Sequence, residues 1–232
     1  MTIRAVIFDV YRTLLEVGPP PADADARWEQ LWRGFFHESP PIRLTEFGVA
    51  AQPIIAREHA AARAAGIAYP EIYWPDVAAE ASPALTKLAA DARLDFLTHH
   101  AALVHTVRLS TEAAELLRML RTRNLALGIA SNAQPYTVRE LHDALAGAGL
   151  PCDIFPPPLC FWSFEHGFSK PDPHVFRLLT ARLRARGITP VETLMVGDRL
   201  DNDIEPARAQ GWQTWHLTPD GWQALHDWLQ HQ

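Results

Sequence analysis

Short apolar runs that stop at polar residues recur along this chain. Residues 3–8 (IRAVIF) are rich in β-branched side chains and end at Asp9, and the run LALGIA ends at Ser131. The runs LCFWSF, TLMVG and WQTWHL have the same character. A continuous apolar run of about four to eight residues is typical of a parallel strand buried on both faces. We therefore expect five strands.

Segments with helical spacing lie between these runs. In residues 111–124, Ala113, Leu116, Leu117 and Leu120 share one face, and residues 135–145 and the stretch that begins at Pro173 have a similar pattern. Strands that alternate with helices predict the α/β class, with a doubly wound parallel sheet and helices on both of its faces.

A long segment interrupts this alternation after the first strand. Gly18 and the three prolines that follow it break the chain, and residues 23–36 and 45–65 then have helical spacing. Another helix is expected to begin at Ser82–Pro83, because proline favours the first helical position. No strand pattern is visible after Leu15 until about Val107. We expect a core unit of residues 1–16 and 106–232, with an all-helical insertion of residues 17–105.

Composition and charge narrow the classes of protein. The 232 residues are 48% hydrophobic and carry a formal net charge of −6, which fits a globular chain and argues against nucleic acid or an anionic membrane as the main partner. No apolar run approaches the roughly 20 residues that cross a bilayer, and the first residues are too quickly acidic for a signal peptide. We therefore expect a cytoplasmic location, while the oligomeric state stays open.

Polar residues at the strand ends are the candidates for chemistry. Asp9, Ser131 and Asp198 each follow a predicted strand, and Lys170 lies on the loop that leaves another. Ligands of open parallel sheets bind in the crevice outside the carboxyl ends of the strands. These four side chains, which are far apart in sequence, are therefore expected to converge.

Four motifs in this order resemble those of the haloacid dehalogenase (HAD) superfamily of hydrolases, across essentially the whole chain. The motifs are FDVYRTLL, IASNA, SKPDP and VGDRLDND, and the residues at their family positions are Asp9, Tyr11, Thr13, Ser131, Lys170, Asp198 and Asp203. The resemblance implies a Rossmann-like core, and it implies that residues 17–105 form the cap domain found in one branch of the family.

The resemblance also implies roles for these residues. Asp9 would be a nucleophile that forms a covalent aspartyl intermediate, and Lys170 would hold it. Ser131 and Asn132 would bind the substrate together with Lys170. A Mg²⁺ ion would be held by a set of oxygen ligands from Asp9, the backbone carbonyl of Tyr11, Asp198 and Asp203.

Two positions depart from the family pattern. Family phosphatases carry an aspartic acid two residues after the nucleophile, where this chain has Tyr11, and glycine is usual where it has Arg12. Tyr11, which we include among the candidate catalytic residues, resembles the tyrosine of the metal-independent 2-haloacid dehalogenases. Losing a general acid costs roughly 10²- to 10⁴-fold in rate, so acyl or aryl phosphates should outperform sugar phosphates.

The retained acids decide our main expectation. Without a cation, Asp9, Asp198 and Asp203 would crowd like charges into one crevice, so we expect a Mg²⁺-dependent, phosphatase-type hydrolase of a small phosphorylated metabolite. A 2-haloacid dehalogenase, and a weakly catalytic protein that binds a phosphorylated ligand, are the alternatives. A phosphonate-cleaving branch would use a lysine of the insertion, where Lys87 is the only one. Which residues of the insertion face the crevice is open; the candidates are Arg27, Trp28, Trp32, Arg33 and Trp74.

Overall fold

The five expected strands form a single parallel sheet in the computed structural model, which describes residues 2–231. Its order is β5-β4-β1-β6-β7, and every neighbouring pair is parallel. The bounds are β1 Ala5–Phe8, β4 Ala126–Ser131, β5 Cys160–Trp162, β6 Thr193–Gly197 and β7 Gln213–His216. The doubly wound α/β prediction is confirmed. Strand β5 is shorter than the run LCFWSF because Ser163 already begins the short helix α7 (Ser163–His166).

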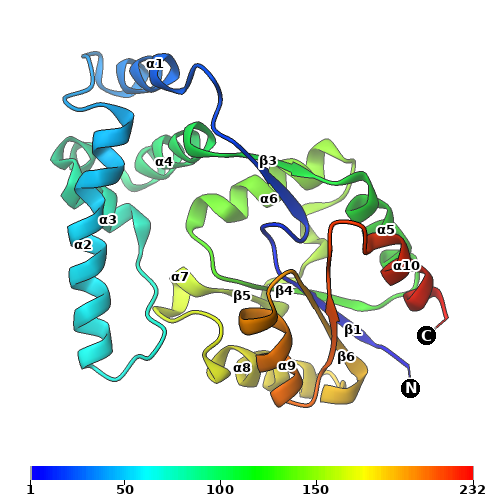
Figure 1. Cartoon of the computed structure of the whole chain (residues 1–232). Coiled ribbons are helices and arrows are strands. Elements are labelled where there is room, and N and C mark those ends of the chain that lie inside the picture. The colour runs from blue at the N-terminus through cyan, green and yellow to red at the C-terminus, as the bar shows by residue number, and fades with distance from the viewer. Residues whose placement is uncertain (1, 232) are drawn as a thin grey trace.

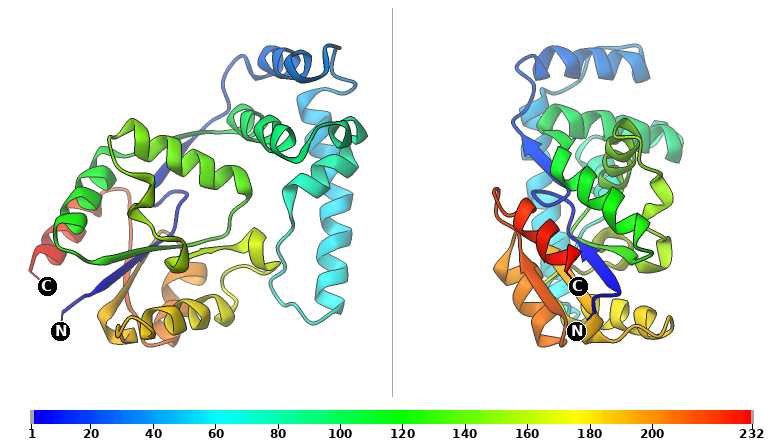
Figure 2. Two further views of the ribbon diagram at one scale, coloured as in Figure 1. Left: turned by 180° about the vertical axis from the view of Figure 1, so that it is seen from behind. Right: turned by 90° about the vertical axis from the view of Figure 1, so that its right-hand side faces the viewer.

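Helices cover both faces of this sheet (Figures 1 and 2). Successive side chains of a strand point to opposite faces, so Val6 and Phe8 pack into one hydrophobic core while Ala5 and Ile7 pack into the other. The first core includes α5 (Thr111–Thr122), α6 (Pro135–Gly147) and α10 (Trp222–Gln230). The second includes α8 (Pro173–Arg184) and α9 (Glu205–Ala209). We call this sheet with its helices the sheet unit.

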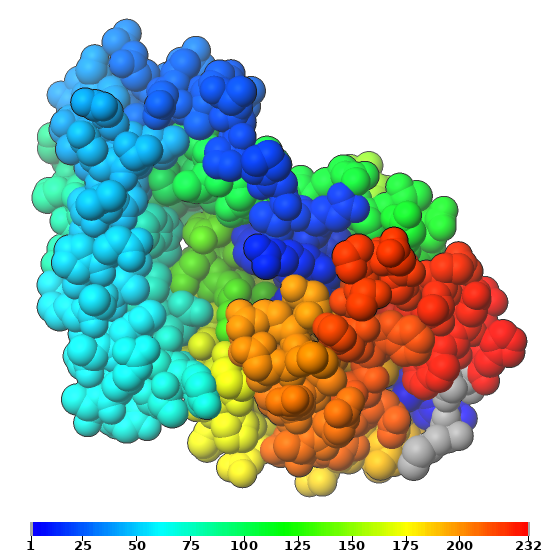
Figure 3. Space-filling view, viewed as in Figure 1, coloured from blue at the N-terminus to red at the C-terminus, as the bar shows by residue number. Residues whose placement is uncertain are grey.

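The helices between β2 and β3 form a second lobe beside the sheet unit, the helical unit (Figures 1 and 3). It consists of α1 (Ala24–Phe36), α2 (Leu44–Ala64), α3 (Trp74–Ala81), a 3₁₀ turn (Pro83–Lys87) and α4 (Ala90–Val104). Its own core contains Trp28, Trp32, Phe47 and Phe96. Within residues 2–231, none of the helices has both the length and the apolar character that crossing a bilayer requires.

Two short strands join the units and correct the sequence-based expectation. Strands β2 (Leu15–Gly18) and β3 (Thr106–Leu109) pair antiparallel, although neither was among the five expected strands and β2 extends into the insertion that was expected to be all-helical. Each has only four residues and mostly exposed or half-exposed side chains, so neither carries a buried apolar run. The segment after Ser82 is likewise a 3₁₀ turn, and the helix itself starts at Ala90.

Polar groups also connect the helical unit to the sheet unit. Ser163 Oγ donates to Glu71 Oε2 at 2.7 Å, and Gln134 Nε2 donates to Glu71 Oε1 at 3.1 Å. The backbone nitrogen of Trp74 donates to Gln134 Oε1 at 2.8 Å. Gln134 precedes α6 and follows Ser131 by three residues, so this contact fixes the helical unit next to the carboxyl end of β4.

Candidate active site

The carboxyl ends of the three central strands bring the candidate residues to one place. Asp9 follows β1, Ser131 ends β4 and Asp198 follows β6, and these strands are neighbours in the sheet. They border a cavity of about 200 Å³ whose lining residues are Asp9, Tyr11, Arg12, Ser131, Asn132, Lys170, Asp198, Arg199, Asn202 and Asp203. The lining therefore includes every residue that the sequence analysis assigned to catalysis, substrate binding or the metal, namely Asp9, Tyr11, Ser131, Asn132, Lys170, Asp198 and Asp203.

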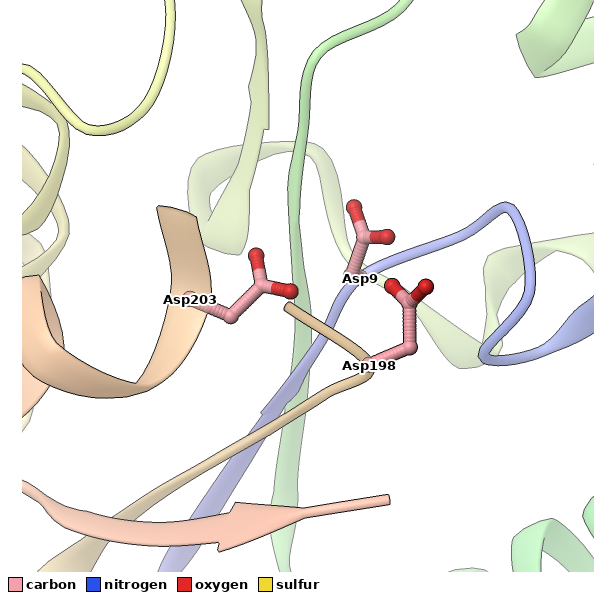
Figure 4. Close-up of side chains that lie close together, drawn as sticks. All are labelled: Asp9, Asp198 and Asp203. Atoms are coloured by element: carbon pink, nitrogen blue, oxygen red, sulfur yellow. The ribbon is translucent and has the colours of Figure 1, made fainter. Parts of the chain in front are cut away.

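Three carboxyl groups converge here (Figure 4). One oxygen each from Asp9, Asp198 and Asp203 lies within 4.8 Å of the others, a separation that a single cation can bridge. The hard carboxylate oxygens of such a set are the ligand type that Mg²⁺ prefers. In residues 2–231 this is the only such cluster of acidic, histidine or cysteine side chains.

Lys170 links two of these carboxylates. Its ammonium is almost fully buried and donates to Asp9 Oδ1 at 2.8 Å and also to Asp203 Oδ1. Burial by itself would lower the pKa of Lys170, but the two carboxylates outweigh it and hold the pKa above its ordinary value. Asn132 positions the backbone of Lys170, since its Nδ2 donates to the Lys170 carbonyl at 2.9 Å and its Oδ1 accepts from the Lys170 nitrogen at 2.7 Å.

Asp203 is held by the turn that follows β6. Its carboxylate is buried, and Oδ2 accepts from the backbone nitrogen of Arg199 at 3.0 Å. A Cβ atom at position 197 would lie only 2.4 Å from that oxygen, so glycine is required there for Asp203 to approach. The Gly-Asp pair of this motif therefore has a steric reason: Gly197 makes room for Asp203, and Asp198 follows at the cavity.

The electrostatics of the cavity favour a bound cation. Burial raises the pKa of Asp9 to about 6, the charge of Lys170 opposes this rise, and the charge of Asp203 adds to it. The pKa of Asp198 is raised by its partial burial and then by Asp203. A divalent cation between these oxygens would stabilise their ionised forms, so the residues present fit Mg²⁺.

The hydroxyl group of Tyr11 forms its hydrogen bonds with residues outside the carboxylate cluster. The hydroxyl donates to Glu140 Oε2 and lies 3.0 Å from Thr137 Oγ1, while His105 Nε2 lies 2.9 Å from Glu140 Oε1. Burial, followed by the charge of Glu140, raises the pKa of Tyr11 far above its ordinary value. No sequence pattern pointed to Thr137, Glu140 or His105, because each looks like an ordinary residue of a helix or its end.

The hydroxyl group of Ser131 is buried beside the cavity without a hydrogen-bond partner. Its side chain is 1% exposed, and Oγ forms no hydrogen bond within the described residues. A buried hydroxyl is costly unless it is satisfied, so a ligand atom in the cavity is a suitable partner for it.

The helical unit contributes no residue to the cavity lining. Trp28 and Trp32 are buried in its own core, and Arg27, Arg33 and Trp74 are absent from the cavity wall, as is Lys87, which is exposed on the 3₁₀ turn. Arg199 and Asn202, which line the cavity, were not among the candidates named from the sequence. Both lie inside the VGDRLDND motif, between residues that were named as candidates, and this position in the motif was the available signal.

Comparisons with known proteins agree with this arrangement. The family model described as haloacid dehalogenase-like hydrolase matches residues 3–211. A phosphoserine phosphatase from Thermus thermophilus is 38% identical over 120 residues, which are 50% of this chain and 45% of that protein. The chain thus spans less than half the length of that relative.

Solved structures share the fold. An enzyme of the HAD family from Bacteroides thetaiotaomicron superposes with a TM-score of 0.61 at 17% identity, over 97% of this chain and 98% of that one. An L-2-haloacid dehalogenase superposes with a TM-score of 0.54 at 21% identity, over 99% of this chain and 100% of that one. The family match over nearly the whole chain, together with the converging acids, identifies this protein as a member of the haloacid dehalogenase-like hydrolases.

Proposed function

We propose that this protein is a Mg²⁺-dependent phosphatase-type hydrolase that acts on a small phosphorylated metabolite through a covalent intermediate at Asp9. The observation that carries the proposal is the cluster of Asp9, Asp198 and Asp203 within reach of one cation, next to the buried Lys170. A phosphoserine phosphatase that matches half of the chain supports the same class of reaction.

Each residue has a task in this reaction. A carboxylate oxygen of Asp9 attacks phosphorus, the bond from phosphorus to the leaving oxygen breaks, and water then hydrolyses the aspartyl phosphate. Lys170 fixes the orientation of Asp9, and the unpartnered Ser131 hydroxyl donates to a phosphoryl oxygen. Asp9, Asp198, Asp203 and the Tyr11 carbonyl would hold Mg²⁺, and the ion would supply positive charge that offsets the repulsion between carboxylate and phosphate.

The leaving group receives no proton from Tyr11. The Tyr11 hydroxyl is engaged with Glu140, and its pKa is raised, so it is a poor acid at neutral pH. We therefore infer a preference for acyl and aryl phosphates, whose leaving groups are stable without protonation.

Residues 17–105 are proposed to act as a cap over the cavity, with residues 1–16 and 106–232 as the catalytic unit. In support, the helical unit has a separate hydrophobic core and is joined to the sheet unit by the two strands β2 and β3. A substrate would then lie between the two units.

A 2-haloacid dehalogenase is the second candidate, and Tyr11 is the observation that favours it. A halide ion needs no proton to leave, so this reaction would tolerate the engaged hydroxyl. It would not need the acids at positions 198 and 203.

Two assays test these candidates. The protein is incubated with p-nitrophenyl phosphate and, separately, with 2-chloropropionate, each with Mg²⁺ or with EDTA. Phosphate release that EDTA abolishes, with no halide release, is expected. Halide release that resists EDTA would support the dehalogenase and contradict the phosphatase. If neither product is released, the result would support a protein that binds a phosphorylated ligand without turnover.

The Asp9→Asn variant tests the nucleophile. Acid quenching of wild-type protein during turnover, followed by peptide mass spectrometry, should find phosphate on the peptide that contains Asp9. The variant should neither turn over nor carry this label. Label on another peptide would contradict the role of Asp9.

A further inference from the structure

Arg12 occupies a backbone conformation that is unusual for its residue type. Its φ angle is +59°, in the left-handed region that glycine adopts without steric cost. Its backbone nitrogen donates to the Leu15 carbonyl, which closes the turn after Asp9 and Tyr11. The backbone conformation at position 12 would therefore suit glycine better than arginine. This favours a role for the arginine side chain that glycine could not fill.

The other cations of the cavity are already committed. Lys170 donates to Asp9 and Asp203. The guanidinium of Arg199 donates to both oxygens of Asp201, at 3.1 and 2.8 Å. Arg12 also lines the cavity, but its side chain has no ion pair or hydrogen bond within residues 2–231, in contrast to the other two cations.

The balance of charge in the cavity favours a role for the Arg12 guanidinium. Asp9, Asp198 and Asp203 carry three negative charges when ionised, and Lys170 together with a divalent cation balances them. A phosphate dianion therefore enters a cavity with no surplus of positive charge unless Arg12 contributes. A guanidinium presents several N–H donors in a plane, which suits phosphate oxygens.

The position of Arg12 indicates which oxygen it meets. In-line displacement puts the leaving oxygen on the side of phosphorus opposite the attacking carboxylate. Asp9 lies inside the cavity with its side chain 13% exposed, whereas Arg12 is exposed at the rim. The leaving oxygen, which faces outward, is thus the atom that an arginine at the rim can reach.

We propose that Arg12 is a catalytic residue that donates hydrogen bonds to the leaving oxygen, in place of the missing general acid; this inference rests on the proposed phosphatase function. When the carboxylate of Asp9 bonds to phosphorus, the electron pair of the broken bond goes to the leaving oxygen. The guanidinium stabilises that negative charge without transferring a proton. The leaving group departs as an aryloxide or carboxylate and takes its proton from water.

A series of aryl phosphates that differ in the acidity of the leaving phenol tests this role. The dependence of log kcat/KM on the pKa of that phenol is measured for the wild type, Arg12→Gln and Arg12→Lys. The Arg12→Gln variant should lose roughly 10²- to 10³-fold on the poorest leaving group and much less on the best, as expected for a lost donor to a developing oxyanion. Its slope should therefore be steeper, and Arg12→Lys should lie between the two.

Backbone strain is controlled with glycine variants. Asn124, in the turn before β4, also has a positive φ of 56° and does not line the cavity. Arg12→Gly should match or exceed the wild type in thermal stability, because glycine adopts this backbone conformation without strain. Asn124→Gly should stay close to the wild type, because asparagine already tolerates the same conformation. Only Arg12→Gly should show the steeper slope.

The outcomes separate the two proposals. If the wild type hydrolyses the series and Arg12→Gln loses the same factor on every ester, or nothing, the leaving-oxygen role is wrong and the phosphatase function stands. If the wild type releases no phosphate from any ester, the proposed function fails and this inference falls with it.

Discussion

The Tyr11 hydroxyl donates a hydrogen bond to the Glu140 carboxylate, and this pair ties the loop after Asp9 to helix α6. The same carboxylate meets His105, which lies between α4 and β3. One buried acid therefore connects the cavity loop, the sheet unit and the junction with the helical unit. Tyr11 thus has a structural role in addition to its place beside the nucleophile candidate.

A double-mutant cycle measures the strength of this contact. Tyr11→Phe and Glu140→Gln should each lower the free energy of unfolding by about 1.5–3 kcal/mol, the range for hydrogen bonds to charged groups. Their effects should fall short of additivity by at least about 0.5 kcal/mol, because either change already breaks the pair. Urea unfolding monitored by circular dichroism gives all four values. Fully additive losses would show that the two groups do not interact.

The sequence predicted the sheet well because its strands are buried on both faces. The short apolar runs that form β1, β4 and β6 are typical of buried parallel strands, and their carboxyl ends bring Asp9, Ser131 and Asp198 to one edge of the sheet. Strands β2 and β3 were not predicted, because each is short and largely exposed and so has no buried apolar run.

The partners of the site residues were not predictable in the same way. Glu140 is a single acid within an amphipathic helix, and no local pattern marks it as the acceptor of a tyrosine 129 positions earlier. The conformation of Arg12 was equally hidden, because a positive φ is a property of the folded turn and its residue type indicates the opposite.

Lys170 should be far more important for stability than the other lysine of the chain. In Lys170→Met, the carboxylates of Asp9 and Asp203 lose the buried cation they share, so the free energy of unfolding should fall by about 3–5 kcal/mol when Mg²⁺ is absent. Lys87 is exposed, and Lys87→Met should change it by no more than about 0.5 kcal/mol. Denaturant unfolding in EDTA provides the comparison, and similar losses in both variants would refute the buried bridge.

Mg²⁺ should stabilise the folded protein even without substrate. At a free concentration of 100 times its Kd, a ligand that binds only the folded state adds about 2.7 kcal/mol, so differential scanning calorimetry should detect a higher Tm with Mg²⁺. The Asp198→Asn variant should lose this increase. Asp201→Asn serves as a matched control and should keep it, because Asp201 is exposed, pairs with Arg199 and does not belong to the carboxylate cluster. A Tm that is indifferent to Mg²⁺ in the wild type would favour the metal-independent dehalogenase.

His100 should make the stability of the protein depend on pH. It is buried among Trp28, Phe47 and Trp74, and burial, with a smaller effect of His105, lowers its pKa from 6.5 to about 4. Above pH 6.5 the histidine is neutral in both the folded and the unfolded chain. As the pH falls from 6.5 to about 4, the unfolded chain takes up a proton that the folded chain does not, so stability is lost across this window.

The loss attributable to His100 should be about 3 kcal/mol over that window, at 1.36 kcal/mol for each unit of pKa difference. Urea unfolding between pH 7 and pH 4 should show a shallower decline for His100→Gln than for the wild type. The exposed neighbour His99 provides the control, since His99→Gln should keep the wild-type slope. Parallel curves for the wild type and His100→Gln would mean that His100 takes up its proton as readily in the folded as in the unfolded chain, contrary to its burial.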